Sequence, residues 1–255
     1  MDVPAGEDAT RSGSSPGPGA LGQLESVVRT VAAASAAGAL LGVLVGGVGG
    51  RLGMALLAAK NPDATGRISD DGFRIGQFTL GGTIQLLAAC LQLGLIAAMI
   101  YLALRGLALG PRWLRVAELA LGATVVFGAI LISPDGVDFV ILDPPLLPIA
   151  VFLVIPAVFS VLLCLLTEHW LAPTAWFAHA PVRQVGATLL VWVLTGPLLV
   201  VLAAALGLGV VWRRASASVP ARLRSGLTWC TRLLAGGVGI WALTALVADV
   251  DAILG

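Results

Sequence analysis

Two short segments combine aspartate, glycine and phenylalanine, and they are the first places in this sequence where polar chemistry is expected. They are Ser69-Asp70-Asp71-Gly72-Phe73 and Pro134-Asp135-Gly136-Val137-Asp138-Phe139. Clustered carboxylates beside glycine can ligate a hard cation through oxygen, or bind arginine or sugar hydroxyls. Neither segment has the fixed ligand positions and terminal glutamate of an EF-hand. We therefore favour the simpler alternative, an Asp-Gly turn that phenylalanine anchors at the membrane interface.

Arg51 is the candidate partner of these aspartates. It follows the first apolar stretch near the same predicted membrane boundary, so a charge-assisted contact with Asp70 or Asp71 is one interpretation. The other is an arginine that extends its side chain to lipid headgroups. The candidate polar site consists of Arg51, Asp70, Asp71, Asp135 and Asp138.

The first apolar stretch carries a small residue at every fourth position. This glycine stripe consists of Ala34, Gly38, Gly42, Gly46 and Gly50. Residues four apart share one helical face, so the missing side chains let a second helix approach closely. We expect the stripe to pack the first helix within a bundle or against another copy of the chain.

Composition places these features in a membrane. Apolar residues make up 58% of the 255-residue chain and charged residues 11%, with a mean hydropathy of +0.98. A formal net charge of +1 gives no broad basic field, so we expect no nucleic-acid partner. The expected surroundings are the lipid bilayer of the cell membrane, with either a membrane-protein partner or a homo-oligomer.

Hydropathy and length predict an all-α, polytopic bundle of about six transmembrane helices. Residues 1–24 are predicted to form a disordered tail, and residues 25–255 a single transmembrane domain whose first helix is retained. About 20 apolar residues cross a bilayer as a helix. The six stretches that meet this length are 30–58, 80–104, 115–133, 146–168, 185–212 and 227–248.

The positive-inside rule gives conflicting indications of orientation. With the amino terminus in the cytoplasm, the arginines of segment 105–115 are cytoplasmic and the acidic segment 135–143 is outside. The arginines of segment 213–224 would then also face outside. An inverted topology or a re-entrant segment would remove the conflict, and we favour a cytoplasmic amino terminus.

No catalytic motif is present among the nucleotide-binding, zinc-protease and serine-hydrolase patterns. Glu168, His169 and His179 lie near one another in sequence, but two histidines without further ligands are weak evidence for a metal or an acid–base pair. The three cysteines fall in three different apolar stretches and are interpreted as small packing residues. We therefore predict no catalytic residue, no metal and no cofactor.

Three runs of residues resemble a family of multi-pass membrane proteins of actinobacteria that has no assigned activity. They are Gly46–Arg51, Asp70–Phe73 with Gly76 and Thr79, and Asp138-Phe139 with Leu142-Asp143-Pro144. The resemblance extends over residues 38–170 and more weakly over Asp249–Leu254. It implies a shared arrangement of helix, Asp-containing loop and helix, and it implies no catalytic residue.

These observations predict a non-enzymatic membrane component, an accessory or assembly subunit packed through its first helix. A small transporter or channel with the Asp loops at its mouth is the alternative, and an intramembrane enzyme is the third. A continuous cavity lined by Pro156, Pro197 and polar groups would favour transport, whereas a lipid-facing glycine stripe would favour a partner helix.

Overall fold

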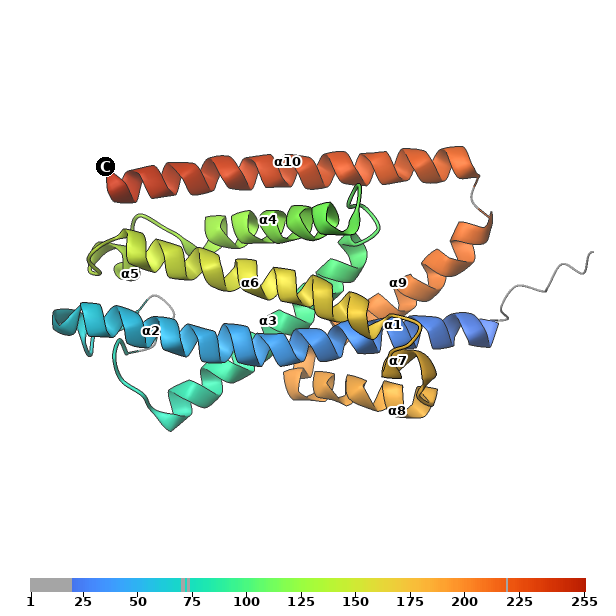
Figure 1. Cartoon of the computed structure of the whole chain (residues 1–255), viewed down its shortest axis with the longest axis horizontal. Coiled ribbons are helices and arrows are strands. Elements are labelled where there is room, and N and C mark those ends of the chain that lie inside the picture. The colour runs from blue at the N-terminus through green and yellow to red at the C-terminus, as the bar shows by residue number, and fades with distance from the viewer. Residues whose placement is uncertain (1–19, 70–71, 73, 219) are drawn as a thin grey trace, which may run out of the picture.

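The fold is an all-helical bundle (Figure 1). It comes from a computed structural model, which describes residues 20–69, 72, 74–218 and 220–255. These residues form no strand, apart from an isolated bridge between Ile68 and Arg74. The helices are α1 (Ala20–Leu41), the π-helical η1 (Gly42–Val48), α2 (Gly49–Lys60), the 3-10 turn η2 (Pro62–Ala64), α3 (Leu80–Leu104), α4 (Arg112–Leu131), α5 (Val137–Val140), α6 (Leu146–Trp170), α7 (Trp176–His179), α8 (Val182–Ala187), the 3-10 helix η3 (Thr188–Leu198), α9 (Leu199–Ser218) and α10 (Ala221–Leu254).

Six helical stretches in the described part are long and apolar enough to cross a membrane, as predicted. They are Leu21–Lys60, Leu80–Leu104, Arg112–Leu131, Leu146–Trp170, Val182–Trp212 and Ser225–Leu254. In hydrocarbon every backbone N–H and C=O must find an internal partner, which favours helices throughout. The chain is therefore a multi-pass membrane protein.

The first helix begins earlier than the predicted tail boundary. Residues 1–19 lie outside the described part, but Ala20 already starts α1, so assigning residues 20–24 to the tail was wrong. Glu25 and Arg29, one turn apart, form an ion pair of 2.7 Å between Oε1 and Nη2. Such pairs stabilise helical turns, and this one supports the extra helical turn beyond the apolar stretch.

Proline marks the start of four helices. Pro111, Pro145, Pro181 and Pro220 immediately precede α4, α6, α8 and α10. A proline has no N–H to donate and a fixed φ, so it is well tolerated where a helix starts and poorly tolerated inside one. α3 begins differently, because the Thr79 hydroxyl accepts a hydrogen bond from the N–H of Gly82 at 3.2 Å.

The glycine stripe packs against α3 of the same chain. A Cβ on Gly38 would overlap the carbonyl oxygen of Gly94, and a Cβ on Gly94 would overlap that of Gly38. A Cβ on Gly42 would overlap the carbonyl of Cys90, while one on Gly46 would lie 3.2 Å from the Cys90 Cβ. The two backbones therefore approach to a distance that only glycine allows at this crossing.

A π-helical segment interrupts the first helix within this stripe. Four residues slightly exceed one turn of an α-helix, so a four-residue stripe drifts around the helix surface. In η1 the turns are wider, as the bond from the Gly49 N–H to the Leu44 carbonyl shows. The wider turns counter the drift, so that Gly38, Gly42 and Gly46 all face α3.

The fifth apolar stretch, Val182–Trp212, enters the bundle beside the first turns of α1 and returns to the same part of α1. Gly186 in α8 lies beside Val28 of α1, and Gly209 in α9 returns to Val27. Between these two points the backbone reverses at Gly196, whose φ of 59° and ψ of −109° are not helical. α8, η3 and α9 thus form a re-entrant hairpin, which lies against α1 in Figure 1.

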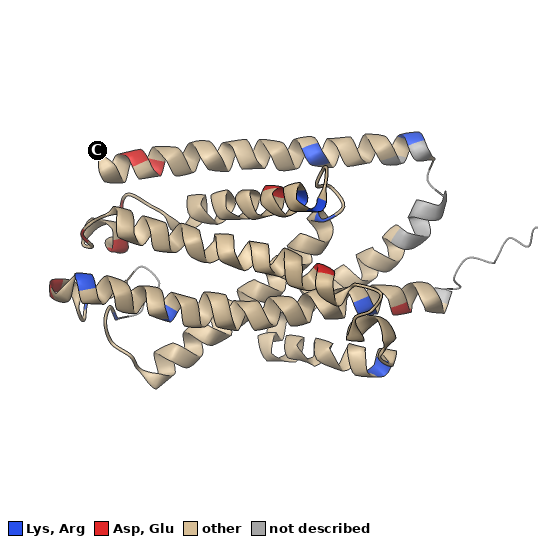
Figure 2. Cartoon of the chain, in the orientation of Figure 1, with Lys and Arg blue, Asp and Glu red and all other residues tan. Residues whose placement is uncertain are grey.

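Charged side chains gather at the two ends of the bundle (Figure 2). One end, here called the Arg-rich end, is formed by the start of α1, the connection between α3 and α4, and the starts of α8 and α10. Its described arginines are Arg29, Arg105, Arg112, Arg115, Arg183, Arg222 and Arg232. The other, the Asp-rich end, is formed by the segments after α2 and α4 and by the end of α10. Its described aspartates are Asp63, Asp135, Asp138, Asp143, Asp249 and Asp251. Because the hairpin returns, α10 starts at the Arg-rich end and runs to the Asp-rich end.

Candidate functional site

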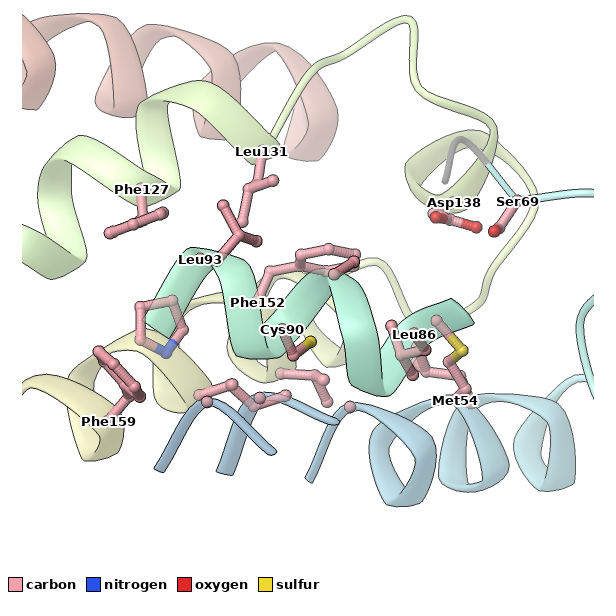
Figure 3. A pocket seen from close by; sticks show the side chains of 18 of the residues that line it. Met54, Ser69, Leu86, Cys90, Leu93, Phe127, Leu131, Asp138, Phe152 and Phe159 are labelled. Atoms are coloured by element: carbon pink, nitrogen blue, oxygen red, sulfur yellow. The ribbon is translucent and has the colours of Figure 1, made fainter. Parts of the chain in front are cut away.

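A cavity of about 390 Å³ lies between the first helix, α3, α4 and α6. We call it the central cavity. Its volume falls within the range of small-molecule sites, and most of its wall is aliphatic or aromatic. Figure 3 shows Phe127 and Leu131 of α4 on one side, Leu93 of α3 beside them, and Phe152 of α6. These residues give the cavity an apolar interior.

Glycine provides part of the space. Gly42, Gly46 and Gly50 line the cavity on the side of the first helix, and Gly94 lines it from α3. The glycine stripe therefore both brings two helices together and leaves their common surface without side chains. Pro156 of α6 also lines the cavity, whereas Pro197 lies in the re-entrant hairpin and does not.

Polar lining residues gather where the cavity approaches the Asp-rich end. They are Ser69, Arg74, Gln85 and Asp138. Figure 3 places the side chains of Asp138 and Ser69 beside each other at this end, away from Phe159 at the apolar end. Asp138 is 6% exposed, so its carboxyl group is largely withdrawn from the surface. The cavity thus has one polar mouth and one apolar end.

A short helix holds Asp138 in this position. α5 follows a turn in which the N–H of Gly136 donates to the carbonyl of Ser133 at 3.0 Å. The next residue after Asp138, Phe139, is buried and lies with its ring centroid 5.5 Å from that of Phe152. Packing of Phe139 into the core therefore directs its neighbour towards the cavity mouth, and the phenylalanine does not act as an interfacial anchor.

The segment before α3 positions Ser69 and Arg74. Gly66 N–H donates to the Ile75 carbonyl and Ile75 N–H to the Arg67 carbonyl, both at 2.9 Å. Between these two bonds the N–H of Gly72 donates to the carbonyl of Ser69, and the φ of Gly72 is +79°. This positive φ explains why glycine follows the two aspartates, as the predicted Asp-Gly turn requires.

Asn61 joins the two loops that form the mouth, and sequence reasoning missed it. Its side-chain Oδ1 accepts the backbone N–H of Asp143 at 2.8 Å, and its Nδ2 donates to the carbonyl of Leu57 at 3.0 Å. The end of α2 is thereby tied to the loop before α6. The one sequence signal for this role was that Asn61 directly follows Lys60 at the end of an apolar helix.

The central cavity also opens sideways between α3 and α4. Leu93 and Ala89 of α3 and Leu131 of α4 line it, yet their side chains remain exposed. In a membrane this surface faces lipid. A lipid-soluble molecule could therefore reach the cavity from within the bilayer.

Packed side chains close the cavity towards the Arg-rich end. Beyond Ala97 and Phe159 lies a core of α1, α3, α6 and η3. Leu95, Leu163 and Trp192 are buried in this core, and Trp192 is 0% exposed. The cavity therefore has no continuous path to the Arg-rich end in this conformation.

The predicted polar residues separate in the fold. Arg51 is buried, with its guanidinium carbon 5.8 Å from the ring centroid of Phe78, and Asp138 is buried at the cavity mouth. Asp135 is exposed and does not line the cavity, whereas Asp138 does. A reverse turn between them points one outward and the other inward. Asp70 and Asp71 lie outside the described residues, and the proposed pairing with Arg51 stays a prediction.

The polar residues at the end of α6 serve packing contacts. Glu168 accepts a hydrogen bond from the Tyr101 hydroxyl at 2.8 Å and pairs with Arg105 at 3.2 Å. His169 and His179 are exposed. Within the described ranges no three His, Cys, Asp or Glu side chains are grouped to hold a metal. The Glu168 carboxylate, which the sequence placed near His169 and His179, thus joins α6 to the end of α3.

Comparison with known proteins adds no relative. No family model, curated protein or solved structure matches the chain.

Proposed function

We propose that this chain is a non-enzymatic protein of the cell membrane that binds a small lipid-soluble molecule in the central cavity. One observation carries the proposal: an apolar cavity of about 390 Å³ has the buried residues Ser69 and Asp138 at one mouth and exposed apolar residues at a lateral opening. Apolar walls with a few placed polar groups are typical of small-molecule sites.

The geometry favours a binding site over an open channel. The core around Trp192 blocks passage towards the Arg-rich end, and Pro197 is remote from the cavity. The glycine stripe faces α3, which removes the main sequence argument for a partner helix at this surface. Binding of a ligand inside the bundle is therefore our first proposal, in place of the accessory role that the sequence alone favours.

Charge distribution supports an orientation for the site. Cytoplasmic segments of membrane proteins are enriched in Arg and Lys. Among the described side chains, the Arg-rich end has the seven arginines named above, and the Asp-rich end has the four basic residues Arg51, Lys60, Arg67 and Arg74. We place the Arg-rich end in the cytoplasm, so the mouth of the cavity faces the opposite side. The re-entrant hairpin removes the conflict posed by segment 213–224.

An accessory role is the second candidate, and α10 is the observation that favours it. This helix contacts the bundle through residues such as Leu246, near Gly128 of α4. Gly236, Gly237 and Gly239 have no heavy atom within 4 Å of an added Cβ. Small residues on a lipid-facing helix permit close approach of another helix. Cross-linking from α10 in native membranes, followed by purification, tests this role.

Small molecules that co-purify with the full-length protein test the binding proposal. Wild type and two variants of α3, Leu93→Trp and Ile100→Trp, are purified in mild detergent and their bound small molecules identified by mass spectrometry. Leu93 lines the cavity and is 53% exposed, whereas Ile100 is 50% exposed and does not line it. Both substitutions add the same bulk to the lipid-facing side of one helix.

We expect a bound molecule to be enriched in wild type and in Ile100→Trp and depleted in Leu93→Trp. Equal amounts in all three proteins, or no enrichment in wild type over a detergent blank, would contradict the proposal.

A further inference from the structure

We propose that an anionic phospholipid binds between α4 and α10 at the Arg-rich end, at a site separate from the central cavity. Its phosphate contacts Arg232, and one of its acyl chains lies between the two helices beside Leu121 and Ala235. This binding goes beyond the proposed function and does not depend on it.

α4 and α10 separate towards the Arg-rich end. Further along they are in contact, because a Cβ on Gly128 would lie 3.1 Å from a methyl carbon of Leu246, and Ala242 is 0% exposed. Seven residues make nearly two helical turns, so Leu121 lies on the same side of α4 as Gly128, and Ala235 on the same side of α10 as Ala242. Yet Leu121 is 67% exposed and Ala235 is exposed. Side chains therefore leave a space open here, which we call the α4–α10 crevice.

Arg232 closes the crevice at the Arg-rich end. Its Nε donates to the carbonyl of Leu107 in the connection between α3 and α4 at 2.8 Å, and its guanidinium carbon lies 5.2 Å from the ring centroid of Trp229. The rise along α10 from Arg232 to Ala242 is about 15 Å, roughly half of the hydrocarbon thickness of a bilayer. The crevice therefore has the depth of one leaflet, and an acyl chain of that leaflet can enter it.

The position of Arg232 calls for an anion. The residue lies inside the apolar stretch Ser225–Leu254, about 10 Å along the helix from its start. Its contacts with the described residues use Nε and the face of the guanidinium, and none of them is with a carboxylate. A charged side chain within a membrane span is costly unless it is paired. The terminal groups Nη1 and Nη2 can donate two parallel hydrogen bonds to a phosphate.

Arg232 belongs to a group of basic side chains around the connection between α3 and α4. Arg112 and Arg115 begin α4 directly after this connection, and both are exposed. Figure 2 shows blue segments of α4 and α10 beside each other at this end. Glu118, whose carboxylate accepts the N–H of Leu109 at 3.0 Å, offsets one of these three positive charges. A phosphate that binds Arg232 therefore meets an excess of positive charge.

The neighbouring segments do not reverse this excess. Glu168 is paired with Arg105 at 3.2 Å, and residues 169–248, which include the connection between α9 and α10, contain no aspartate or glutamate. A zwitterionic head such as phosphatidylethanolamine would bring its ammonium group among these arginines, whereas an anionic head such as phosphatidylglycerol would not. Basic sites between transmembrane helices recognise anionic lipid heads for this reason.

Phospholipid binding to the full-length protein tests this inference. Delipidated protein in detergent is titrated with dioleoylphosphatidylglycerol or dioleoylphosphatidylethanolamine, and binding is measured by native mass spectrometry. The two lipids have the same chains and differ in the charge of the head. We expect the first phosphatidylglycerol to bind about tenfold more tightly than phosphatidylethanolamine. Equal binding of the two lipids would overturn the proposal.

Glycerol 3-phosphate distinguishes a lipid from a soluble phosphate, because it has the phosphate without the chains. We expect it not to displace phosphatidylglycerol. Displacement at similar concentrations would assign the site to a soluble phosphate and overturn the assignment to a lipid.

Two arginine variants of α10 locate the phosphate. Arg232→Gln is expected to weaken phosphatidylglycerol binding roughly fivefold, the effect of one basic residue close to an anionic head. Arg222→Gln removes an exposed arginine from the first turn of the same helix and is the matched control, with no expected change. Equal losses in both variants would mean that the lipid responds to the basic end as a whole, and would overturn the role of Arg232.

Two tryptophan variants of α4 locate the acyl chain without changing any charge. Leu121→Trp fills the crevice and is expected to weaken phosphatidylglycerol binding at least about fivefold. Ile130→Trp adds the same bulk on the opposite side of α4, where Ile130 is 69% exposed, and should leave binding unchanged. Wild-type binding in Leu121→Trp would overturn the placement in the crevice. So would efficient cross-linking of Leu121→Cys to another protein in native membranes, since a partner helix would then fill the crevice.

Discussion

Trp192 donates its indole N–H to the hydroxyl oxygen of Ser35 at 2.9 Å, and both residues are fully buried. Ser35 lies in α1, and Trp192 lies in η3 near the tip of the re-entrant hairpin. The bond joins the hairpin to the first helix where neither water nor lipid headgroups can offer another partner. It therefore fixes the tip of the hairpin against α1, together with the surrounding apolar contacts.

Loss of this bond is expected to destabilise the fold. Ser35→Ala leaves the indole N–H buried without its partner, at a cost of about 1 to 3 kcal/mol in the free energy of unfolding. Trp192→Phe removes the donor and also leaves a small void. In a double-mutant cycle, measured by denaturant unfolding in detergent, the two effects should be strongly non-additive. Additive effects would show that the bond contributes no coupling.

The re-entrant hairpin predicts which segments share one side of the membrane. In a cysteine-free background, Arg112→Cys and Arg222→Cys should react with a membrane-impermeant maleimide from the same side, and Asp251→Cys from the opposite side. The reason is that α8 and α9 both meet α1 near Val27 and Val28, so the chain leaves where it entered.

A six-crossing topology gives the reverse result for two of these sites. Arg222→Cys would then label from the side opposite to Arg112→Cys, and Asp251→Cys from the same side. Asp135→Cys is the control, because both topologies place it opposite Arg112.

The crossing of α1 and α3 predicts a sharp difference between two glycines. Gly94→Ala would place a methyl group 2.9 Å from the Cα of Gly42 and against the Gly38 carbonyl. We expect a loss of about 1 to 3 kcal/mol in the free energy of unfolding from overpacking. The matched control is Gly122→Ala in α4, where nothing lies within 4 Å of an added Cβ.

For Gly122→Ala we expect no loss, and a gain of up to about 1 kcal/mol from helix propensity. Similar unfolding curves for both alanine variants would mean that the two backbones are not in close contact.

Arg29 predicts a local effect on the segment between α6 and α8. Its Nη1 donates to the carbonyls of Phe177 and Ala180 at 2.7 and 2.8 Å, which fixes α7 against α1. Arg29→Gln cannot make both bonds, so amide hydrogen exchange in residues 172–181 should become faster. Arg183→Gln changes an exposed arginine nearby and should leave exchange unaltered. Unchanged exchange in Arg29→Gln would show that α7 is held by its apolar contacts alone.

Composition and hydropathy alone were enough to predict a membrane setting, an all-α fold and six apolar stretches. The reason is that hydrocarbon accepts few charges and leaves no partner for an unsatisfied backbone group. Gly38, Gly42 and Gly46 likewise predict a close contact with another helix, because two helix backbones approach this closely only where side chains are absent. These features depend on residue type and local spacing.

Tertiary structure decided which helix covers the glycine stripe, that the chain reverses at Gly196, and that Asp138 turns inward while Asp135 stays outside. A glycine–proline pair is compatible with a kink or with a full reversal, and local sequence does not distinguish them. The central cavity depends on how α3, α4 and α6 are spaced around the first helix. That spacing follows from contacts between residues far apart in the chain, such as Ser35 with Trp192, which no local pattern encodes.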